Sequence, residues 1–567
     1  MDSYGWSYRW RMSRVAGVSM ALVAVTAGAV GPAAGGIAEA AAPGVSIQLA
    51  GGSSSPWAKS KWGDDETRED EQASAATGTW QADHDTGSLY TVTRFHGAHD
   101  AWGKSDASGK KITGKGVTVA LIDTGVAPVE GLATPGKIIN GPDLSIESQA
   151  PNLRHLDGFG HGTHMAGIIA GRDSSVPAGG ENDAKHFVGI APGARILNMK
   201  VATADGATDV SQVIAAIDWV VQHRKDNGMN VRVINLSYGT SSTQSYVLDP
   251  LAHAVENAWR AGVVVVAAAG NDGTGRMLTM PAVDPFVIAV GATDHQGSDE
   301  VKDDRLAAFT NTDAGARQAD LLAPGKSLVS LRVPGSIADR GHPEGLVTGD
   351  AGKRFFRGSG TSQATAAVSG AVALLLQERP TMTPNQVKAL LKKSATNLSK
   401  SSLRGVGLLD IKKAMETATP STKASVQSYP TSTGLGSLEA SRGNSHLTDP
   451  DNGAVLSGEQ DISGGAWDAR RWSTASAGGV AWTGGSWNAR RWSGEGWSGQ
   501  SWTSATWSAA AWSDSSWTGT AWSARRWSGD TWSARRWSGD DWSARRWSGD
   551  NWRARRWSGV YVTQPTW

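Results

Sequence analysis

The sequence predicts an α/β fold with a mainly parallel central sheet, followed by a low-complexity C-terminal tail rich in tryptophan. Two observations predict the sheet: short apolar runs recur through the middle of the chain, and helical patterns lie between them. Alternation of this kind is typical of parallel βαβ units with helices on both faces of the sheet. The third observation is a tryptophan at nearly every fifth position after residue 465, which sets the tail apart.

Five short runs are expected to form the buried strands of this sheet. Each is mostly apolar and has the length of a strand rather than of a helix. The clearest helical patterns lie between the runs, and two more follow the last run. The runs are residues 117–122, 196–201, 231–236, 263–269 and 286–290, and the helices are expected at 210–224, 250–260, 362–377 and 384–394. We therefore expect one globular region from residue 90 to residue 417.

The N-terminus has the pattern of a secretory signal peptide. Three arginines (Arg9, Arg11 and Arg14) precede an apolar stretch at 15–30, and Ala38-Glu-Ala40 offers small residues at cleavage spacing. An uncleaved membrane anchor is the alternative, but the stretch is short and rich in Ala and Gly for a spanning helix. We expect a signal peptide at 1–40, a secreted, extracellular protein, and no stable membrane span after its removal. The polar residues 41–89 are expected to be a flexible pro-region or linker.

Bulk composition excludes several classes of protein. The 567 residues are too many for one compact core, so more than one region is expected. A net charge of +1 gives no global case for binding nucleic acid or a membrane surface. The chain has no cysteine, which excludes disulfide frameworks and thiolate metal sites.

Four separate motifs each contain one residue type that acyl transfer requires. Asp123 ends an apolar run in Asp123-Thr-Gly125, and His161 lies between glycines in Gly160-His161-Gly-Thr-His164. Asn271 follows the apolar run 263–269, and Ser362 opens an Ala-rich helical pattern. An acid, a base, an amide donor and a nucleophile thus occur in one of the known chain orders of a catalytic triad. A strand end or a helix start would present each of them at the carboxyl edge of the sheet.

Each motif taken alone has a simpler interpretation. Strand-end aspartates and helix-start serines are often caps, so Asp123 and Ser362 are persuasive only together. A zinc site at His161 and His164 is disfavoured because no Glu lies between them in a His-Glu-x-x-His pattern. His164 is therefore interpreted as a structural, hydrogen-bonding histidine.

In this order and on these elements, the motifs resemble those of the subtilisin-like serine protease family, including its secreted bacterial members. The resemblance extends from residue 90 to 417. It implies a subtilisin-like three-layer fold and a serine endopeptidase that hydrolyses peptide bonds of polypeptide substrates through an acyl-enzyme intermediate. Residue by residue, it implies a catalytic triad of Asp123, His161 and Ser362, an oxyanion donor in Asn271, and a substrate-binding strand at Ser237, Tyr238 and Gly239.

The chain departs from the family pattern beside the expected nucleophile. Gln363 and Ala366 stand where the family usually has Met and Pro. Since Ala is the better helix former, the helix itself is expected to survive. Structural calcium is common in the family and stays possible by this resemblance, but no loop here has a defensible ligand spacing, so no metal ligand is named and no other cofactor is expected. Asp303-Asp304 and residues 311–313 are interpreted as solvated turns.

The last 150 residues divide into a predicted linker at 418–464, rich in Ser, Thr and Gly, and a repeat at 465–567. The best-formed repeat units begin at Trp522, Trp532 and Trp542, so the period is ten residues with two tryptophans in each unit. A helix turns about 100° per residue, so no helical face collects these side chains. Extended strands would form two tryptophan ladders, whereas the polar residues between them favour disorder. Both interpretations stay open.

Arginine next to tryptophan suggests what the tail would bind. Ala-Arg-Arg-Trp occurs six times, which makes Arg–Trp stacking available. Such a tail would suit a cell wall or another anionic or sugar-rich surface, whereas interleaved Asp and export disfavour nucleic acid. A stalk without a specific ligand is the alternative. For the whole chain, the rival to a peptidase is a surface-binding protein whose protease-like domain is inactive or only processes itself.

Overall fold

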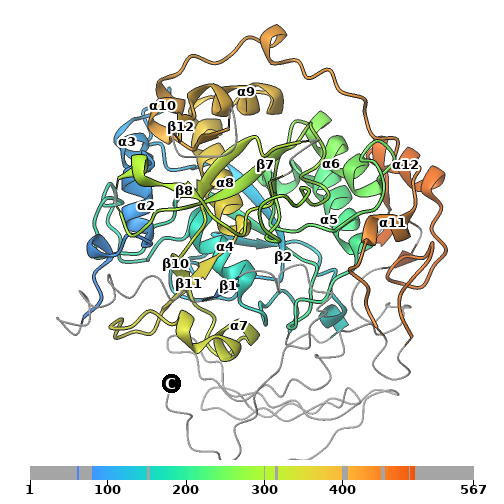
Figure 1. Cartoon of the computed structure of the whole chain (residues 1–567), viewed down its shortest axis with the longest axis horizontal. Helices are drawn as coiled ribbons and strands as arrows, with labels where there is room; N and C mark the ends of the chain where they lie inside the picture. Colours follow the sequence, from blue (N-terminus) through green and yellow to red (C-terminus); the bar gives the residue numbers. More distant parts are fainter. Residues whose placement is uncertain are drawn as a thin grey trace, which may run out of the picture. The chain divides into compact units, whose positions relative to one another are not determined.

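A central, mainly parallel sheet runs through the protein (Figure 1). The computed structural model describes residues 61–62, 79–149, 153–298, 300–312, 317–398, 406–448, 454–483, 485–488 and 490–491. The predicted signal peptide at 1–40, most of the predicted pro-region and the tryptophan repeats after residue 491 lie outside these residues. Every described residue belongs to one compact unit, which spans residues 49–567.

Within the described residues the sheet has ten strands in the order β12-β13-β9-β7-β6-β5-β2-β4-β3, with β8 paired to β7. All its pairs are parallel except β7 with β8 and β12 with β13. The predicted α/β fold with a mainly parallel sheet is thereby confirmed. The strands are β2 (Thr118–Asp123), β3 (Ile138–Asn140), β4 (Arg195–Lys200), β5 (Val231–Leu236), β6 (Val264–Ala268), β7 (Ile288–Asp294), β8 (Arg305–Leu306), β9 (Leu321–Pro324), β12 (Thr396–Asn397) and β13 (Gly407–Leu408).

Helices cover the sheet on both sides. Two helix pairs pack on it: α4 lies against α8 and contacts β2 and β4, whereas α5 lies against α6, and these two contact β2 and β6. α8 packs on β5, β6 and β7 and against α4. The α-helices are α2 (Leu89–Phe95), α3 (Ala98–Gly103), α4 (His161–Ala170), α5 (Val210–His223), α6 (Pro250–Arg260), α7 (Ile337–Gly341), α8 (Thr361–Glu378), α9 (Pro384–Ser394), α10 (Ile411–Glu416), α11 (Leu438–Arg442) and α12 (Ala469–Ala477).

Three of the four helices expected from sequence begin at strong local signals. Asp209 and Thr383 form capping boxes with Gln212 and Gln386 at the starts of α5 and α9. Asp249 caps α6 ahead of a proline at its first position. α8 runs without a break from Thr361 to Glu378. These signals are local in sequence, which is why the predicted ranges agree with the observed ones to within a residue or two.

Shorter elements complete the fold. A three-stranded sheet contains β1 (Lys61–Trp62), β11 (Phe355–Ser359) and β10 (Leu328–Leu331), so a short stretch of the predicted pro-region pairs with the strand that leads to Ser362. A second small sheet contains β14 (Trp482–Thr483), β15 (Ser486–Trp487) and β16 (Arg490–Arg491). The 3₁₀ helices are η2 (Ala82–His84), η3 (Ile146–Gln149), η4 (Asp226–Gly228), η5 (Val301–Asp303), η6 (Pro343–Gly345) and η7 (Lys423–Ser425).

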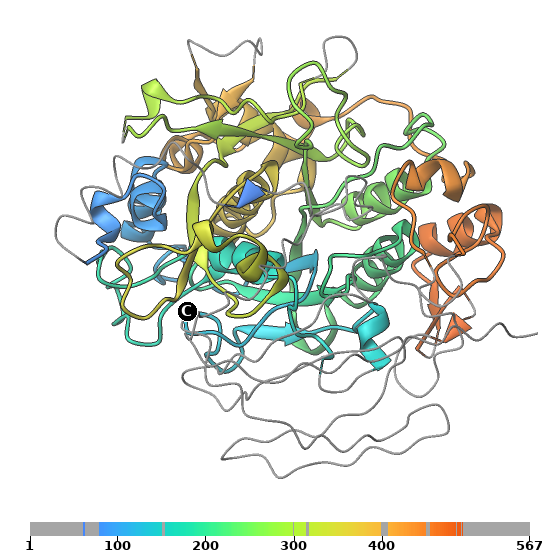
Figure 2. The same ribbon diagram turned by 60° about the horizontal axis from the view of Figure 1, so that its bottom comes forward.

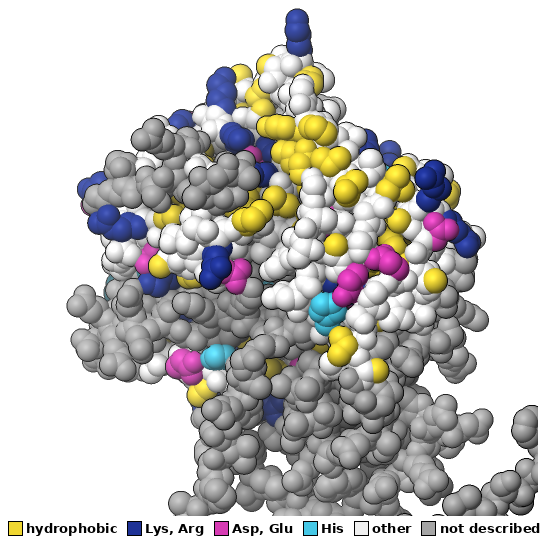
Figure 3. Space-filling view, turned by 45° about the vertical axis from the view of Figure 1, so that its right-hand side comes forward, with side chains coloured by type: hydrophobic (Ala, Val, Ile, Leu, Met, Phe, Trp, Pro, Cys, Tyr) yellow, Lys and Arg dark blue, Asp and Glu magenta, His cyan; other side chains and the backbone are white. Residues whose placement is uncertain are grey.

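The described parts of residues 418–464, predicted to be a linker, pack against the globular region. α11 packs on α5 and α6, and α12, from the first tryptophan repeat, packs on α6 (Figures 1 and 2). Leu438, Leu456 and Ile462 are fully buried there. These apolar residues are too sparse to form a periodic pattern, so composition alone suggested a linker. In the view of Figure 3, hydrophobic side chains gather in the upper middle of the face, and Lys and Arg side chains lie around them.

The first tryptophans of the repeat are buried in the same region. Trp467, Trp472, Trp482 and Trp487 are each at most 7% exposed. The indole N–H groups of Trp472 and Trp487 both donate to Asp218 on α5, at 2.9 and 2.8 Å. These units therefore form neither a simple ladder nor a free stalk. Within the described ranges, no helix is long and apolar enough to cross a bilayer.

Candidate active site

The fold brings the four predicted motifs to the carboxyl edge of the sheet and the helix starts beside it. Asp123 is the last residue of β2, and Asn271 follows β6, which runs parallel to β2 in the same sheet. His161 opens α4, and Ser362 is the second residue of α8. Because α4 and α8 pack against each other, residues from distant parts of the sequence meet at one edge, where ligands bind in open α/β sheets.

Asp123 and His161 form a direct, buried hydrogen bond. His161 Nδ1 lies 2.7 Å from Asp123 Oδ1, and the two side chains are 0% and 1% exposed. The backbone N–H of Thr124 donates to the same oxygen at 2.8 Å. A carboxylate on Nδ1 holds the imidazole in one orientation and favours the tautomer whose Nε2 can accept a proton.

Two glycines allow the loop after β2 to approach the start of α4. Gly125 has φ +110°, a conformation that side-chain-bearing residues rarely adopt. A Cβ on Gly162 would lie 2.1 Å from Gly125 O. This close backbone contact is what allows Asp123 to reach His161.

Asp157 holds the N-terminus of α4 and was not identified from sequence. It is 2% exposed and accepts hydrogen bonds from Gly160 N and Thr163 N, both at 2.7 Å. It also accepts from Thr124 Oγ1 at 2.8 Å, which ties the helix start to the end of β2. Gly160 has no capping side chain, so Asp157 takes that role. The sequence signal was Asp157-Gly158, a common turn pair just ahead of the histidine motif.

His164 makes a structural hydrogen bond, as the sequence interpretation proposed. Its Nε2 lies 3.1 Å from Phe356 O, and its side chain is fully buried. Burial lowers the pKa of His164 to about 3, and the neighbouring charge of His161 acts in the same direction. The imidazole is thus neutral at physiological pH. In the described part of the chain, no three His, Cys, Asp or Glu residues are placed to hold a metal ion.

Ser362 is the second residue of α8, and Asn271 is hydrogen-bonded to the first. Asn271 Oδ1 accepts from the backbone N–H and the hydroxyl of Thr361, at 2.8 and 2.9 Å. With Oδ1 bonded in this way, Nδ2 is the donor that a ligand would meet. A Cβ on Gly360 would lie 3.3 Å from Asn271 Nδ2 and 2.8 Å from Gln363 Oε1, so a larger residue would push against both side-chain amides. The positive end of an 18-residue helix adds favourable potential for an anion.

The departures from the family pattern leave the helix intact. Gln363 and Ala366 are both fully buried within α8. The expectation that the helix survives without the proline is confirmed.

Asn311 supports the loop that carries Asn271, and its interpretation as part of a solvated turn is wrong. It is 1% exposed, accepts from Asp272 N at 2.6 Å and donates to Met277 O at 2.8 Å. Asp304 is likewise buried, at 4% exposed, and accepts from Thr293 Oγ1 at 3.1 Å. Burial raises the pKa of Asp304 to about 7. Polar clusters look solvated in sequence whenever the groups that pair with them lie elsewhere in the chain. Residue 313 lies outside the described residues.

The predicted substrate-binding residues directly follow β5. Ser237 Oγ donates to Ser362 O at 3.2 Å and accepts from Asn235 Nδ2 at 3.0 Å, so the segment touches the nucleophile's own backbone. Tyr238 is 1% exposed, and burial raises its pKa, with the charge of Asp209 adding to the effect. Its side chain therefore lies inside the protein and does not line an open pocket. A Cβ on Gly239 would lie 2.2 Å from Thr279 Oγ1, which explains the glycine.

The sequence is similar to proteins of one known family. The model of the subtilase family matches residues 114–408, which is just over half of the chain. Serine protease AprX of Bacillus subtilis (strain 168) is 37% identical over 292 residues, which cover 50% of this chain and 62% of AprX. Subtilisin Savinase of Lederbergia lenta is 33% identical over 314 residues, covering 54% of this chain and 94% of Savinase. The crystal structure of a cold-adapted subtilisin-like serine proteinase matches 57% of this chain and 98% of its own, at 29% identity and a TM-score of 0.40.

Proposed function

The chain belongs to the subtilase family, and on that premise we propose that it is a secreted serine endopeptidase that acts through Asp123, His161 and Ser362. The observation that carries the proposal is the buried 2.7 Å hydrogen bond between Asp123 and His161, at the start of a helix that packs against the helix of Ser362. Secretion is supported by the signal-peptide pattern at residues 1–40.

The proposed reaction is a double displacement on a peptide carbonyl. His161 Nε2 takes the hydroxyl proton as Ser362 Oγ attacks the carbonyl carbon. The C–N bond then breaks as His161 returns the proton to the leaving amine, which leaves an acyl group on Ser362. Water, activated by the same imidazole, releases the acid and restores the hydroxyl. Asp123 stabilises the imidazolium in both halves of the reaction.

Charge on the tetrahedral intermediate develops on the former carbonyl oxygen. Asn271 Nδ2 and the backbone N–H of Ser362 are the proposed donors to this oxyanion. Support comes from the orientation of the Asn271 amide, whose Oδ1 is bonded to Thr361. Donors fixed before the reaction stabilise such charge without reorganising.

Polypeptides are the proposed substrates, bound along Ser237 to Gly239. This segment follows β5 directly, and the Ser237 hydroxyl donates to the backbone carbonyl of Ser362. An extended peptide that added there would place one of its carbonyls near the nucleophile.

A fluorophosphonate probe tests the proposal. Wild-type protein is expected to be labelled, Ser362→Ala is expected not to be labelled, and Ser174→Ala, at an exposed serine, is expected to be labelled like wild type. Equal labelling of wild type and Ser362→Ala would refute the assignment of the nucleophile.

A second assay separates the peptidase from the rival function, a surface-binding protein with an inactive or self-processing domain. Wild type is mixed with an unfolded protein and with its own Ser362→Ala variant. Cleavage of both is expected. Cleavage of the variant alone would favour self-processing, and cleavage of neither would favour an inactive domain.

For the tail we propose binding to cell-wall material through the tryptophan and arginine repeats. The support is compositional: thirteen Arg and eight acidic residues lie in 461–567, beside regularly spaced tryptophans. Full-length protein and a chain ending at Arg491 are compared in a cell-wall sedimentation assay. Equal sedimentation of the two would rule the proposal out.

A further inference from the structure

The segment around α11 is joined to the chain that follows the proposed substrate strand. Thr240, the residue after Gly239, donates from Oγ1 to Ser441 O at 2.6 Å. Thr243 N donates to Ala440 O at 3.1 Å. The side-chain amide of Gln244 completes the contact with both backbone groups of Ser437, at 2.7 and 3.0 Å. Residues 437–441 are thus hydrogen-bonded to residues 240–244 at three positions: Thr240, Thr243 and Gln244.

Close packing reinforces these hydrogen bonds. A Cβ on Gly443 would lie 2.3 Å from Ser241 O, and Gly443 has φ +61°. No side-chain-bearing residue fits there without displacing one of the two backbones. The position of residues 240–244 is therefore coupled to that of α11.

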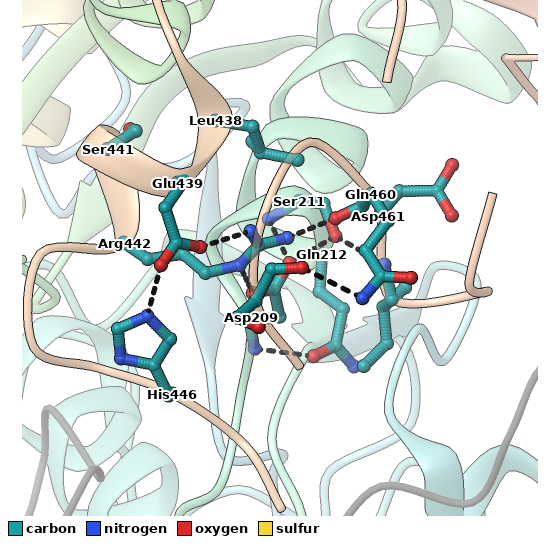
Figure 4. Close-up of polar contacts among 12 residues, drawn as sticks. Asp209, Ser211, Gln212, Leu438, Glu439, Ser441, Arg442, His446, Gln460 and Asp461 are labelled. Carbon is teal, nitrogen blue, oxygen red and sulfur yellow. Dashed lines mark hydrogen bonds and ion pairs between the residues drawn. The ribbon is translucent and has the colours of Figure 1, made fainter. Parts of the chain in front are cut away.

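Arg442, the last residue of α11, fixes this helix in place. Its side chain is fully buried, and Nε donates to Asp209 Oδ2 at 2.6 Å (Figure 4). Its remaining nitrogens donate to Gly458 O at 2.7 Å, to Glu439 Oε2 at 3.1 Å and to Gln460 O. A buried guanidinium bonded in this way tolerates little displacement, because losing a partner leaves a charge unpaired.

The same cluster connects two helix caps. Asp209 caps α5 by accepting from Ser211 N at 2.9 Å. Ser441 Oγ donates at 3.0 Å to Asp249, which caps α6 by accepting from Leu251 N at 2.8 Å. The loop that contains Gly239 leads from β5 into α6. α11 therefore bridges the start of α5, the start of α6 and the loop between β5 and α6.

We propose that Arg442 is a positioning residue for substrate: by anchoring α11 between Asp209 and residues 240–244, it holds the backbone of Ser237–Gly239 where an extended peptide can pair with it. The inference rests on the proposed peptidase function and adds that the C-terminal region is part of the substrate-binding apparatus. Its action is confined to substrates long enough to reach that strand. A small ester, which needs only the nucleophile and the oxyanion donors, does not depend on it.

The test separates substrate positioning from simple stabilisation. Arg442→Met and Arg442→Lys are compared with wild type on a hexapeptide amide and on a small p-nitrophenyl ester. For Arg442→Met, KM for the hexapeptide is expected to rise about tenfold with kcat within about twofold, the pattern of lost uniform binding. Both constants for the ester are expected to stay within about twofold. Arg442→Lys keeps a positive charge beside Asp209, so its hexapeptide KM is expected to lie between those of wild type and Arg442→Met. Arg471→Met, at an exposed position on α12, is the matched control and is expected to match wild type.

A milder variant covers the case in which Arg442→Met does not fold. Ser441→Ala removes only the hydrogen bond to Asp249 and is expected to raise the hexapeptide KM about twofold to threefold, with the ester unaffected. An unchanged hexapeptide KM in the folded variants, or equal losses on both substrates, overturns the inference. Absence of labelling of wild type by the fluorophosphonate probe would instead refute the proposed function itself.

Discussion

Replacing Asp284 by asparagine is expected to stabilise the protein at neutral and alkaline pH. Asp284 is fully buried, and its Oδ1 accepts from Phe286 N at 2.9 Å. Among the described residues, no group pairs with Oδ2. Burial raises the pKa of Asp284 from 3.8 to about 8, and the charge of Glu256 adds to the effect.

The size of the effect follows from proton linkage. Between pH 4 and pH 8 the folded protein retains a proton that the unfolded chain releases, so the free energy of unfolding falls as pH rises. pH 7 lies about three pH units above 3.8, the ordinary pKa of an aspartate, and each unit is worth about 1.4 kcal/mol. The protonated, buried Asp284 therefore lowers the free energy of unfolding at pH 7 by about 4 kcal/mol. Asparagine keeps the acceptor and does not ionise, but its buried amide N–H groups cost about 1–3 kcal/mol if unpaired. We expect a net gain of about 2 kcal/mol at pH 7, and no gain at pH 4.

Urea denaturation measures this difference in a Ser362→Ala background, which prevents self-digestion. The free energy of unfolding is compared at pH 4, 7 and 8.5 with and without Asp284→Asn. Asp83→Asn, at an exposed aspartate, is the control and is expected to have little effect at any pH. A gain that does not grow with pH, or a loss at every pH, would refute the reasoning.

Three further predictions concern the site and the C-terminal region. Asn271→Ala is expected to lower kcat by about 10²–10³-fold with little change in KM, a magnitude that comes from a subtilisin, a protein of this family. A rise in KM with kcat unchanged would contradict the oxyanion role. Trp472→Ala is expected to reduce the free energy of unfolding by about 3–5 kcal/mol in urea, because the indole is buried and bonded to Asp218, whereas Val480→Ala, at an exposed residue, serves as control. A chain ending at Arg491 is expected to keep the Tm of the full chain in calorimetry, and one ending at Thr417 is expected to melt lower. Equal Tm values for the two would contradict a stabilising role for the packing of α11 and α12 on α5 and α6.

Elements with local signals could be predicted from sequence. Apolar runs of strand length marked β2, β4, β5 and β6, and caps marked the starts of α5, α6 and α9. The candidate site was accessible for the same reason. Asp123 ends an apolar run and Ser362 starts a helix, so their neighbours in sequence show that both reach the carboxyl edge of a parallel sheet.

Residues whose role depends on a distant partner could not be predicted in this way. Asp157 and Asn311 support His161 and Asn271 through bonds to backbone groups, and nothing in their own sequence neighbourhood indicates burial. Tyr238 was expected to contact substrate from the resemblance to the family, but its side chain is buried inside the protein. Periodicity reports on which face of an element is apolar and gives no information on which polar side chain finds a partner.

The sequence by itself determined the order of strands and helices, the positions of the four motifs and the family to which they point. Only the tertiary structure decided that the described residues between 418 and 491 pack with the peptidase domain. Arg442 meets Asp209 across 233 positions of the chain, and Trp472 meets Asp218 across 254. A charged or indole N–H group is stable in the interior only when such a partner is present. That pairing is a property of three-dimensional contact, so a segment with few apolar residues looks like a linker until its partners are known.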